Sequence, residues 1–118
     1  MGLVADLVAR PGVVAAGEYA YRGDRFSYRG ELTEEWARMF SIMSRATTMS
    51  AVMQVNMAES LRPGVGLHPA RGWVVRGAEH SVCVVANVFC LLDNREACLN
   101  EVLGLMRSRL DSASPELV

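Results

Sequence analysis

The chain has 118 residues and a mass of 12.9 kDa, which is a typical size for one domain. Hydrophobic residues make up 51% of it and charged residues 21%, so a disordered chain is excluded. Its net charge of −1 provides no positive field for nucleic acid or anionic lipid. No apolar run approaches the roughly 20 residues of a membrane helix. We therefore expect no nucleic-acid partner and no membrane insertion.

The N-terminus and the cysteines indicate the compartment. The first seven residues lack a basic region, and Asp6 interrupts their apolar stretch, so we expect no secretory signal. Asp6 also stands where a myristoylation motif requires Ser or Thr, which argues against modification of Gly2. The three cysteines, Cys83, Cys90 and Cys98, have no C-x-x-C spacing and fit a reducing cytoplasm better than a disulfide framework.

The first third of the chain predicts a short helix and a hairpin. Apolar residues recur with helical spacing over 3–9, and Pro11 and Gly12 end that segment. Residues 13–21 (VVAAGEYAY) are mostly small or apolar on both faces, which predicts a strand inside a covered sheet. A turn at 22–24 leads to an alternating strand at 25–29, whose arginines suit a sheet edge.

A long helix is predicted in the middle of the chain. Thr33 is a good N-cap, and two glutamates follow it in the first turn, where acidic groups favour the helix dipole. The helix should run to about Leu61, because Pro63 and Gly64 end it. We expect the large apolar residues of its first turns to be core anchors: Trp36, Phe40 and Met43.

The last third predicts three strands and a helix. The strands are 72–77 (GWVVRG), 81–86 (SVCVVA) and 88–93 (VFCLLD), and a tight turn at Asn87 joins the last two. Asn94 is expected to cap the final helix, which has a regular apolar stripe from Leu99 to Leu110. Residues 112–118 are expected to form a frayed tail, so residues 1–111 make the single predicted domain.

These elements predict an α/β (α+β) fold with the order α-β-β-α-β-β-β-α. The first, fourth and fifth strands are apolar on both faces and belong in the middle of the sheet, while the second and third carry arginines and belong at its edges. Hairpins join strands one and two, three and four, and four and five. The antiparallel order 2-1-5-4-3 satisfies all these conditions. The long helix should cover one face of the sheet, with the first and last helices on the other.

Three stretches of this arrangement resemble the roadblock family, the dynein light-chain type of small α/β protein. They are Gly12 to Glu18 leading into the turn at 23–24, the long helix from Thr33, and Gly72 to Gly77 running on to Asp93. The first and third look most like a small, uncharacterised bacterial branch. The resemblance implies a roadblock/profilin-like fold and a homodimer of edge-to-edge sheets, built from the third strand and the long helix. It also implies a scaffold or regulator role, often toward small Ras-like GTPases or motor complexes.

The long helix itself also predicts an interface. Thirteen residues between Arg45 and Glu59 carry no charge, although a helix side that faces solvent is normally charged. Thr48, Val52 and Val55 lie on or beside that side, and an exposed apolar patch commonly marks an interface. The alternative is a helix buried from both sides within one chain. The methionines of the helix are explained either by an adaptable partner surface or by core filling.

The third strand supports the same association. As an edge strand it would offer unpaired N–H and C=O groups to another chain, with only Arg76 as protection. Antiparallel pairing of two copies, or of two closely related chains, would satisfy both edges and bring the long helices side by side. The predicted dimer interface therefore comprises Thr48, Val52, Val55, Trp73, Val74, Val75 and Arg76.

No catalytic, metal or cofactor site is predicted. Gly64-Val65-Gly66 lacks the Lys and Ser/Thr of a phosphate-binding loop. His68 and His80 have no cysteine at ligand spacing, although a cluster of His80 with cysteines on neighbouring strands is conceivable. The predicted function is therefore a non-enzymatic, cytoplasmic homodimer that serves as an interaction platform. The alternative is a small-ligand or thiol-based redox sensor, with Cys83, Cys90 and Cys98 as candidate residues.

Overall fold

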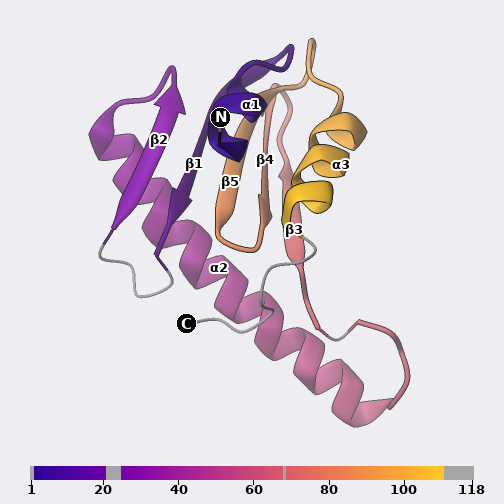
Figure 1. Cartoon of the computed structure of the whole chain (residues 1–118). Coiled ribbons are helices and arrows are strands. Elements are labelled where there is room, and N and C mark those ends of the chain that lie inside the picture. Colours follow the sequence, from indigo (N-terminus) through magenta and orange to yellow (C-terminus); the bar gives the residue numbers. More distant parts are fainter. Residues whose placement is uncertain (1, 21–24, 68, 111–118) are drawn as a thin grey trace.

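The computed structural model describes residues 2–20, 25–67 and 69–110. Three helices and five strands follow one another in the predicted order (Figure 1). Their bounds are α1 Leu3–Val8, β1 Val13–Tyr19, β2 Phe26–Gly30, α2 Glu34–Leu61, β3 Gly72–Arg76, β4 His80–Val85, β5 Val88–Asp93 and α3 Leu99–Leu110. The turn predicted at 22–24, His68 and the tail predicted at 112–118 lie outside the described residues.

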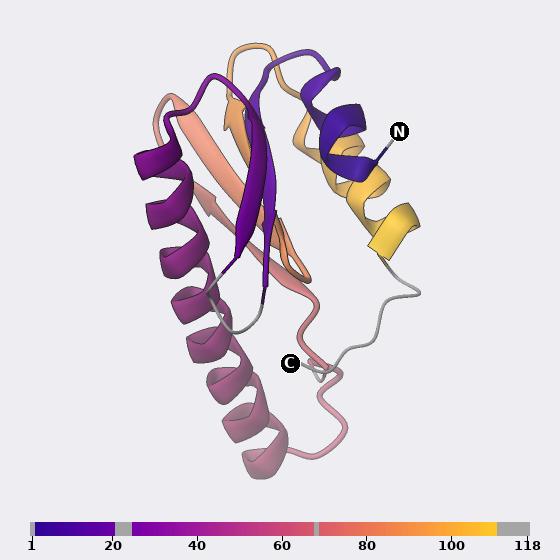
Figure 2. The ribbon, with the colours of Figure 1, turned by 60° about the vertical axis from the view of Figure 1, so that its left-hand side comes forward.

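The five strands form one antiparallel sheet with the order β2-β1-β5-β4-β3, which confirms the predicted topology. The central position of β1, β4 and β5 follows from their composition, because strands that are apolar on both faces need cover on both faces. Figure 2 shows this cover: α1 and α3 lie on one side of the sheet, and α2 lies on the other.

The core between the sheet and the α1/α3 pair is closed. Leu7 of α1 and Met106 of α3 are fully buried against the sheet. The other buried members of this cluster are Ala16, Cys83, Val85, Val88, Cys90, Leu92 and Val102. Arg109 of α3 also forms an ion pair with Asp6 of α1, so the two helices are joined directly.

The second core, under α2, is smaller. Its buried members are Tyr19, Val84 and Phe89, and Phe40 of α2 stacks on the Phe89 ring with centroids 5.9 Å apart. Gly17 of β1 lies against that ring, since a Cβ at this position would come within 2.5 Å of it. A glycine is therefore required here to admit the aromatic core.

The start of the last helix corrects the sequence prediction. The helix begins at Leu99, and Asn94 does not cap it. The Asn94 amide instead donates to the carbonyl of Gly77 at 2.8 Å, and its oxygen accepts from the Ser81 hydroxyl at 2.7 Å. Asn94 thus ties the end of β5 to the β3–β4 turn, a long-range role that local spacing does not reveal. In the described part of the chain, no helix is long and apolar enough to cross a membrane.

Candidate interaction surface

Strand β3 is an edge of the sheet, as predicted. Among the described strands it pairs only with β4, so the N–H and C=O groups along its other side are available to another chain. Val74 and Arg76 are exposed, Val75 is 57% exposed, and Trp73 is half-buried. Two apolar residues on an open edge are a favourable site for strand pairing with a second chain.

The predicted helix residues lie on a different side of α2 than expected. Thr48, Val52 and Val55 are half-buried, and the Trp73 Nε1–H donates to Thr48 Oγ1 at 2.7 Å. This side therefore faces β3 and the sheet, and the prediction that it faces solvent is wrong. The contact fixes the middle of α2 beneath the edge strand.

Because this side of α2 faces the sheet, two of the three residues predicted as core anchors are not in the core. Trp36 is 55% exposed and Met43 is also exposed, while Phe40 packs against the second core. The residues that α2 buries against the sheet are small: Ala37, Ser41 and Ser44. Small residues let the helix approach the strands closely, and they leave its large apolar residues outside.

The outward side of α2 consequently presents a long apolar surface. It runs from Trp36 in the first turn of this 28-residue helix to Leu61, its last residue. Its exposed large side chains are Trp36, Met39, Ile42, Met43, Met49, Met53, Met57 and Leu61. Of the two explanations that the sequence left open for these methionines, their exposure argues against core filling within one chain. Their recurrence at four-residue steps in each half of the helix was the available signal.

Helix α2 covers only part of its side of the sheet. Figures 1 and 2 show the helix running diagonally across the strands, with its C-terminal part extending beyond the end of the sheet. Val75, Val82 and Leu91 lie directly opposite one another on β3, β4 and β5 and form one cross-strand row. Val75 is exposed, and Val82 and Leu91 are only half-buried. Composition alone did not identify this row, because it depends on strand register.

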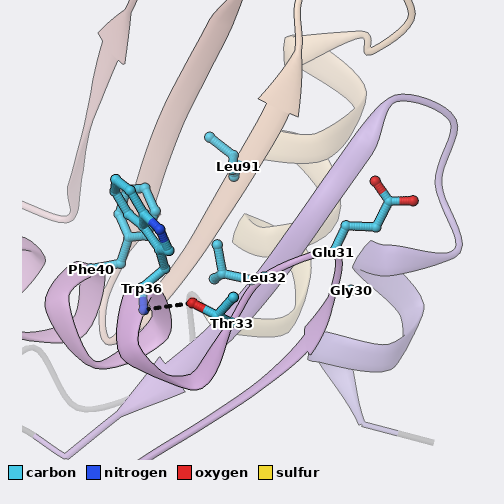
Figure 3. Close-up of a pocket in the computed structure, with 7 residues that line it drawn as sticks. All are labelled: Gly30, Glu31, Leu32, Thr33, Trp36, Phe40 and Leu91. Carbon is cyan, nitrogen blue, oxygen red and sulfur yellow. Dashed lines mark hydrogen bonds between the residues drawn. The ribbon is translucent and has the colours of Figure 1, made fainter.

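A hollow of about 600 Å³ adjoins this row where α2 begins (Figure 3). Trp36 and Phe40 line it from the helix, with ring centroids 6.1 Å apart, and Leu91 lines it from β5. The backbone N–H of Trp36 donates to the N-cap oxygen of Thr33 at 3.1 Å, which fixes the first helical turn beside the hollow. The hollow is therefore a mainly apolar depression on the surface at the start of α2.

The predicted redox residues are divided between two environments. Cys83 and Cys90 are directly opposite on β4 and β5, are fully buried, and lie against Met106. The hydrogen bond with Cys83, together with burial, raises the pKa of the Cys90 thiol well above its usual range. Cys98 is exposed before α3. The structure thus brings two of the three cysteines together, but in a sealed core.

Metal-ligand geometry does not occur among the residues that the structure describes, where no three His, Cys, Asp or Glu side chains could hold an ion. His80 is exposed at the start of β4, whereas Cys83 and Cys90 are buried in the core. The apolar surfaces of β3 and α2 are therefore the features of the described chain with the clearest capacity for binding.

The chain is similar to two kinds of protein. The model of the family described as "Uncharacterized conserved protein (DUF2173)" matches residues 4–108. Among solved structures, the crystal structure of a Roadblock/LC7 domain from Streptomyces avermitilis superposes with a TM-score of 0.62. It is 18% identical in sequence, and the match covers 90% of each chain. No curated protein matches the sequence. The structural likeness confirms the roadblock fold that the sequence motifs predicted.

Proposed function

Because the chain belongs to the DUF2173 family of uncharacterized conserved proteins and has a Roadblock/LC7 fold, we propose that it is a non-enzymatic, cytoplasmic homodimer serving as an interaction platform. Residues 1–111 act as one domain in this proposal. A roadblock-like fold is an interaction-domain type. The observation that carries the proposal is a mismatch within one chain: α2 overhangs the sheet, while the apolar row of Val75, Val82 and Leu91 in the same sheet is only partly covered.

Pairing of β3 with β3 of a second copy removes this mismatch. An antiparallel pair has a two-fold axis normal to the sheet near Val74, the middle residue of the strand. Rotation by 180° about that axis carries the overhanging end of one α2 to the opposite end of the other copy's β3. There it covers the row formed by Val75, Val82 and Leu91.

The residues on each side are suited to this contact. Val52 and Val55 lie on the sheet-facing side of α2 and are half-buried within one chain. Leu61, which ends the helix, is 82% exposed and is available to fill the hollow beside Trp36. Full burial of a valine or leucine side chain stabilises by about 1.5–3 kcal/mol. Burial of several such residues per copy favours association, against the loss of freedom that binding costs.

The direct test is the particle mass of two interface variants, measured by light scattering at micromolar concentration. Val74→Glu and Val52→Glu should each halve the mass, because each places a carboxylate in an apolar contact. Arg29→Glu on the opposite edge strand β2 is the matched control and should leave the mass unchanged. An unchanged mass for both interface variants, with normal circular dichroism, would contradict the proposed dimer.

We further propose that a small Ras-like GTPase is the client of this platform. The support is the family resemblance and the roadblock fold. Tagged protein crosslinked in lysate of its source cell, with and without a GTP analogue, provides the test. Nucleotide-dependent capture of a small GTPase is the expected result. Capture that is instead changed by reductant would favour the sensor alternative.

The thiol-based sensor is the second candidate, and the exposed Cys98 is the observation that favours it. Titration of the native thiols separates the two functions. We expect one reactive thiol per chain, because Cys83 and Cys90 are sealed between the sheet and α3. If none of the three thiols reacts before denaturation, the redox function fails.

A further inference from the structure

We propose that the outward face of α2 is a second self-association surface, on which α2 of another copy packs antiparallel. The expected number of chains in the assembly rests on the proposed β3 dimer, because two such dimers joined through α2 make a tetramer. The contact between the helices uses a surface that the β3 dimer leaves open, so it can be tested separately.

The outward methionine face is defined by six exposed residues on one side of α2: Met39, Met43, Ala46, Ser50, Met53 and Met57. Met53 is 71% exposed, which is unusual for a large apolar side chain in the middle of a long helix. Glu35 lies one turn before Met39 and about 40° around the helix axis from it, whereas Arg38, Arg45 and Glu59 lie about 100° or more from Met39, so the stretch from Met39 to Met57 carries no charge on this side. An uncharged, exposed face of this length requires cover from another protein surface.

The residues of this face mirror one another about position 48. Met39 and Met57 stand nine positions to either side, Met43 and Met53 stand five positions away, and Ala46 and Ser50 stand two positions away. An antiparallel copy centred on this position brings each residue opposite its counterpart. Ala46 and Ser50 meet at the centre, where small side chains allow the helices to approach closely, and the methionines interlock on both sides. This self-complementarity identifies the occupant as a second copy of the chain.

The charges at the ends of α2 favour the same orientation. Glu34 and Glu35 occupy the first turn, and Arg62 follows the last residue. Antiparallel packing brings the acidic start of one helix toward Arg62 of the other and also opposes the two helix dipoles favourably. Parallel packing would place the glutamates of both copies together, and like charges at an interface are destabilising.

The centre of the proposed helix pair is position 48 of α2, and its place in the fold favours a closed assembly. The hydrogen bond of Trp73 with Thr48 places the midpoint of α2 beneath β3, where the axis of the strand pair passes. That axis is normal to the sheet. The axis of the helix pair lies in the contact plane between the two helices and parallel to the sheet, so the two axes are perpendicular. Where they intersect, the two isologous interfaces give a closed tetramer with two helix pairs in each particle.

Sedimentation velocity between about 1 and 100 µM tests the proposal. The unmodified chain should reach four times the 12.9 kDa chain mass. Met53→Glu should give half of that mass, with at least a tenfold weaker association of dimers. Gly104→Glu is the matched control, since it adds the same charge at an exposed position of α3, on the other side of the sheet, with no atom within 4 Å of its Cβ.

A charge exchange tests the antiparallel register. Met43→Glu alone and Met53→Arg alone should each abolish the tetramer, because each introduces an unpaired charge. The double variant should restore it, since an antiparallel copy brings the new carboxylate of one helix opposite the new guanidinium of the other. Parallel helices would bring like charges together, so failure of the double variant to reassemble would overturn the proposed register.

The outcomes distinguish this proposal from the β3 dimer. A chain that stays dimeric at 100 µM, and becomes monomeric with Val75→Glu, overturns the helix contact and leaves the β3 dimer intact. If Val75→Glu changes nothing and Met53→Glu produces monomers, the β3 dimer fails and the helix contact alone stands. Under the full proposal, Val75→Glu leaves pairs that are held through α2.

Discussion

The two faces of the sheet differ in how completely one chain covers them. Beneath α1 and α3, Leu7 and Met106 have no solvent exposure, and nine buried residues form a continuous core. Beneath α2 the buried cluster comprises three of the described residues, and Val75 on the same side of the sheet is largely exposed. The apolar surface of the first face is therefore fully buried within one chain, whereas part of the apolar surface of the second face stays exposed and can contact another chain.

The difference originates in the helices. Helices α1 and α3 turn leucines, valines and a methionine toward the sheet, as ordinary amphipathic helices do. Helix α2 turns Ala37, Ser41 and Ser44 toward it and carries its methionines outside. Substitutions on the α1/α3 side should therefore mainly lower the free energy of unfolding of one chain. Substitutions on the α2 side should mainly weaken association between chains.

The largest expected effect comes from two adjacent leucines of β5. Leu92→Ala, on the α1/α3 side, should lower the free energy of unfolding by about 2–5 kcal/mol at every protein concentration, since it leaves a cavity in a closed core. Leu91→Ala makes the same chemical change on the α2 side, where the side chain is half-buried. Its cost should be smaller and should grow with protein concentration. Urea unfolding at two concentrations makes the comparison; equal, concentration-independent losses would refute the difference between the faces.

The second prediction concerns the dependence of stability on concentration. Thermal unfolding of the unmodified chain should shift upward as concentration rises, because association stabilises the folded state. Each tenfold increase is worth about 1.4 kcal/mol per mole of dimer. Met53→Glu/Val75→Glu, which disrupts both proposed contacts, should remove the shift. Scanning calorimetry at 10 and 100 µM provides the measurement, and a shift that persists in this variant would show that association uses another surface.

Sequence alone predicted the elements and their order because those depend on local signals. Thr33 with two following glutamates fixed the start of α2, Pro63 fixed its end, and the apolar composition of β4 and β5 placed them inside the sheet. The strand order then followed from short connections and from which strands need cover. Each of these arguments uses residues that are neighbours in the chain.

The orientation of α2 could not be predicted in the same way. The helix is uncharged on two sides, and its larger apolar residues lie on the side that faces outward, so periodicity does not identify the side that packs on the sheet. The choice depends on tertiary contacts: the small residues of α2 pack closely on the strands, and Thr48 accepts a hydrogen bond from Trp73. Asn94 shows the same limit, because its partners Gly77 and Ser81 are remote in sequence.

A third, smaller effect on stability is expected at the contact between α2 and the edge strand β3. Trp73→Phe keeps the ring but removes the N–H that Thr48 accepts, and should cost about 0.5–1.5 kcal/mol of unfolding free energy. Trp36→Phe makes the same change at an exposed indole and should stay within about 0.5 kcal/mol. Chemical denaturation of both variants provides the comparison. A larger loss for Trp36→Phe would mean that the hollow beside it contributes more to folding than the contact beneath β3.

The smallest expected effect lies at the end of the sheet, outside both faces. The backbone N–H of Arg95 donates to Asp93 Oδ1 at 2.9 Å, and this hydrogen bond, aided by the Arg95 side chain, holds the pKa of Asp93 below its usual value of 3.8. A carboxyl with a depressed folded-state pKa stabilises the fold above the unfolded-state pKa, and that stabilisation is lost as the pH falls through the folded-state pKa. Asp93→Asn should therefore reduce stability at pH 5 and have a smaller effect at pH 2.5, so its profile is flatter across this range. Urea unfolding at both pH values measures the difference, with Asp6→Asn as a carboxylate control at the α1–α3 contact. If Asp93→Asn is equally destabilising at both pH values, the turn depends on side-chain shape rather than on charge.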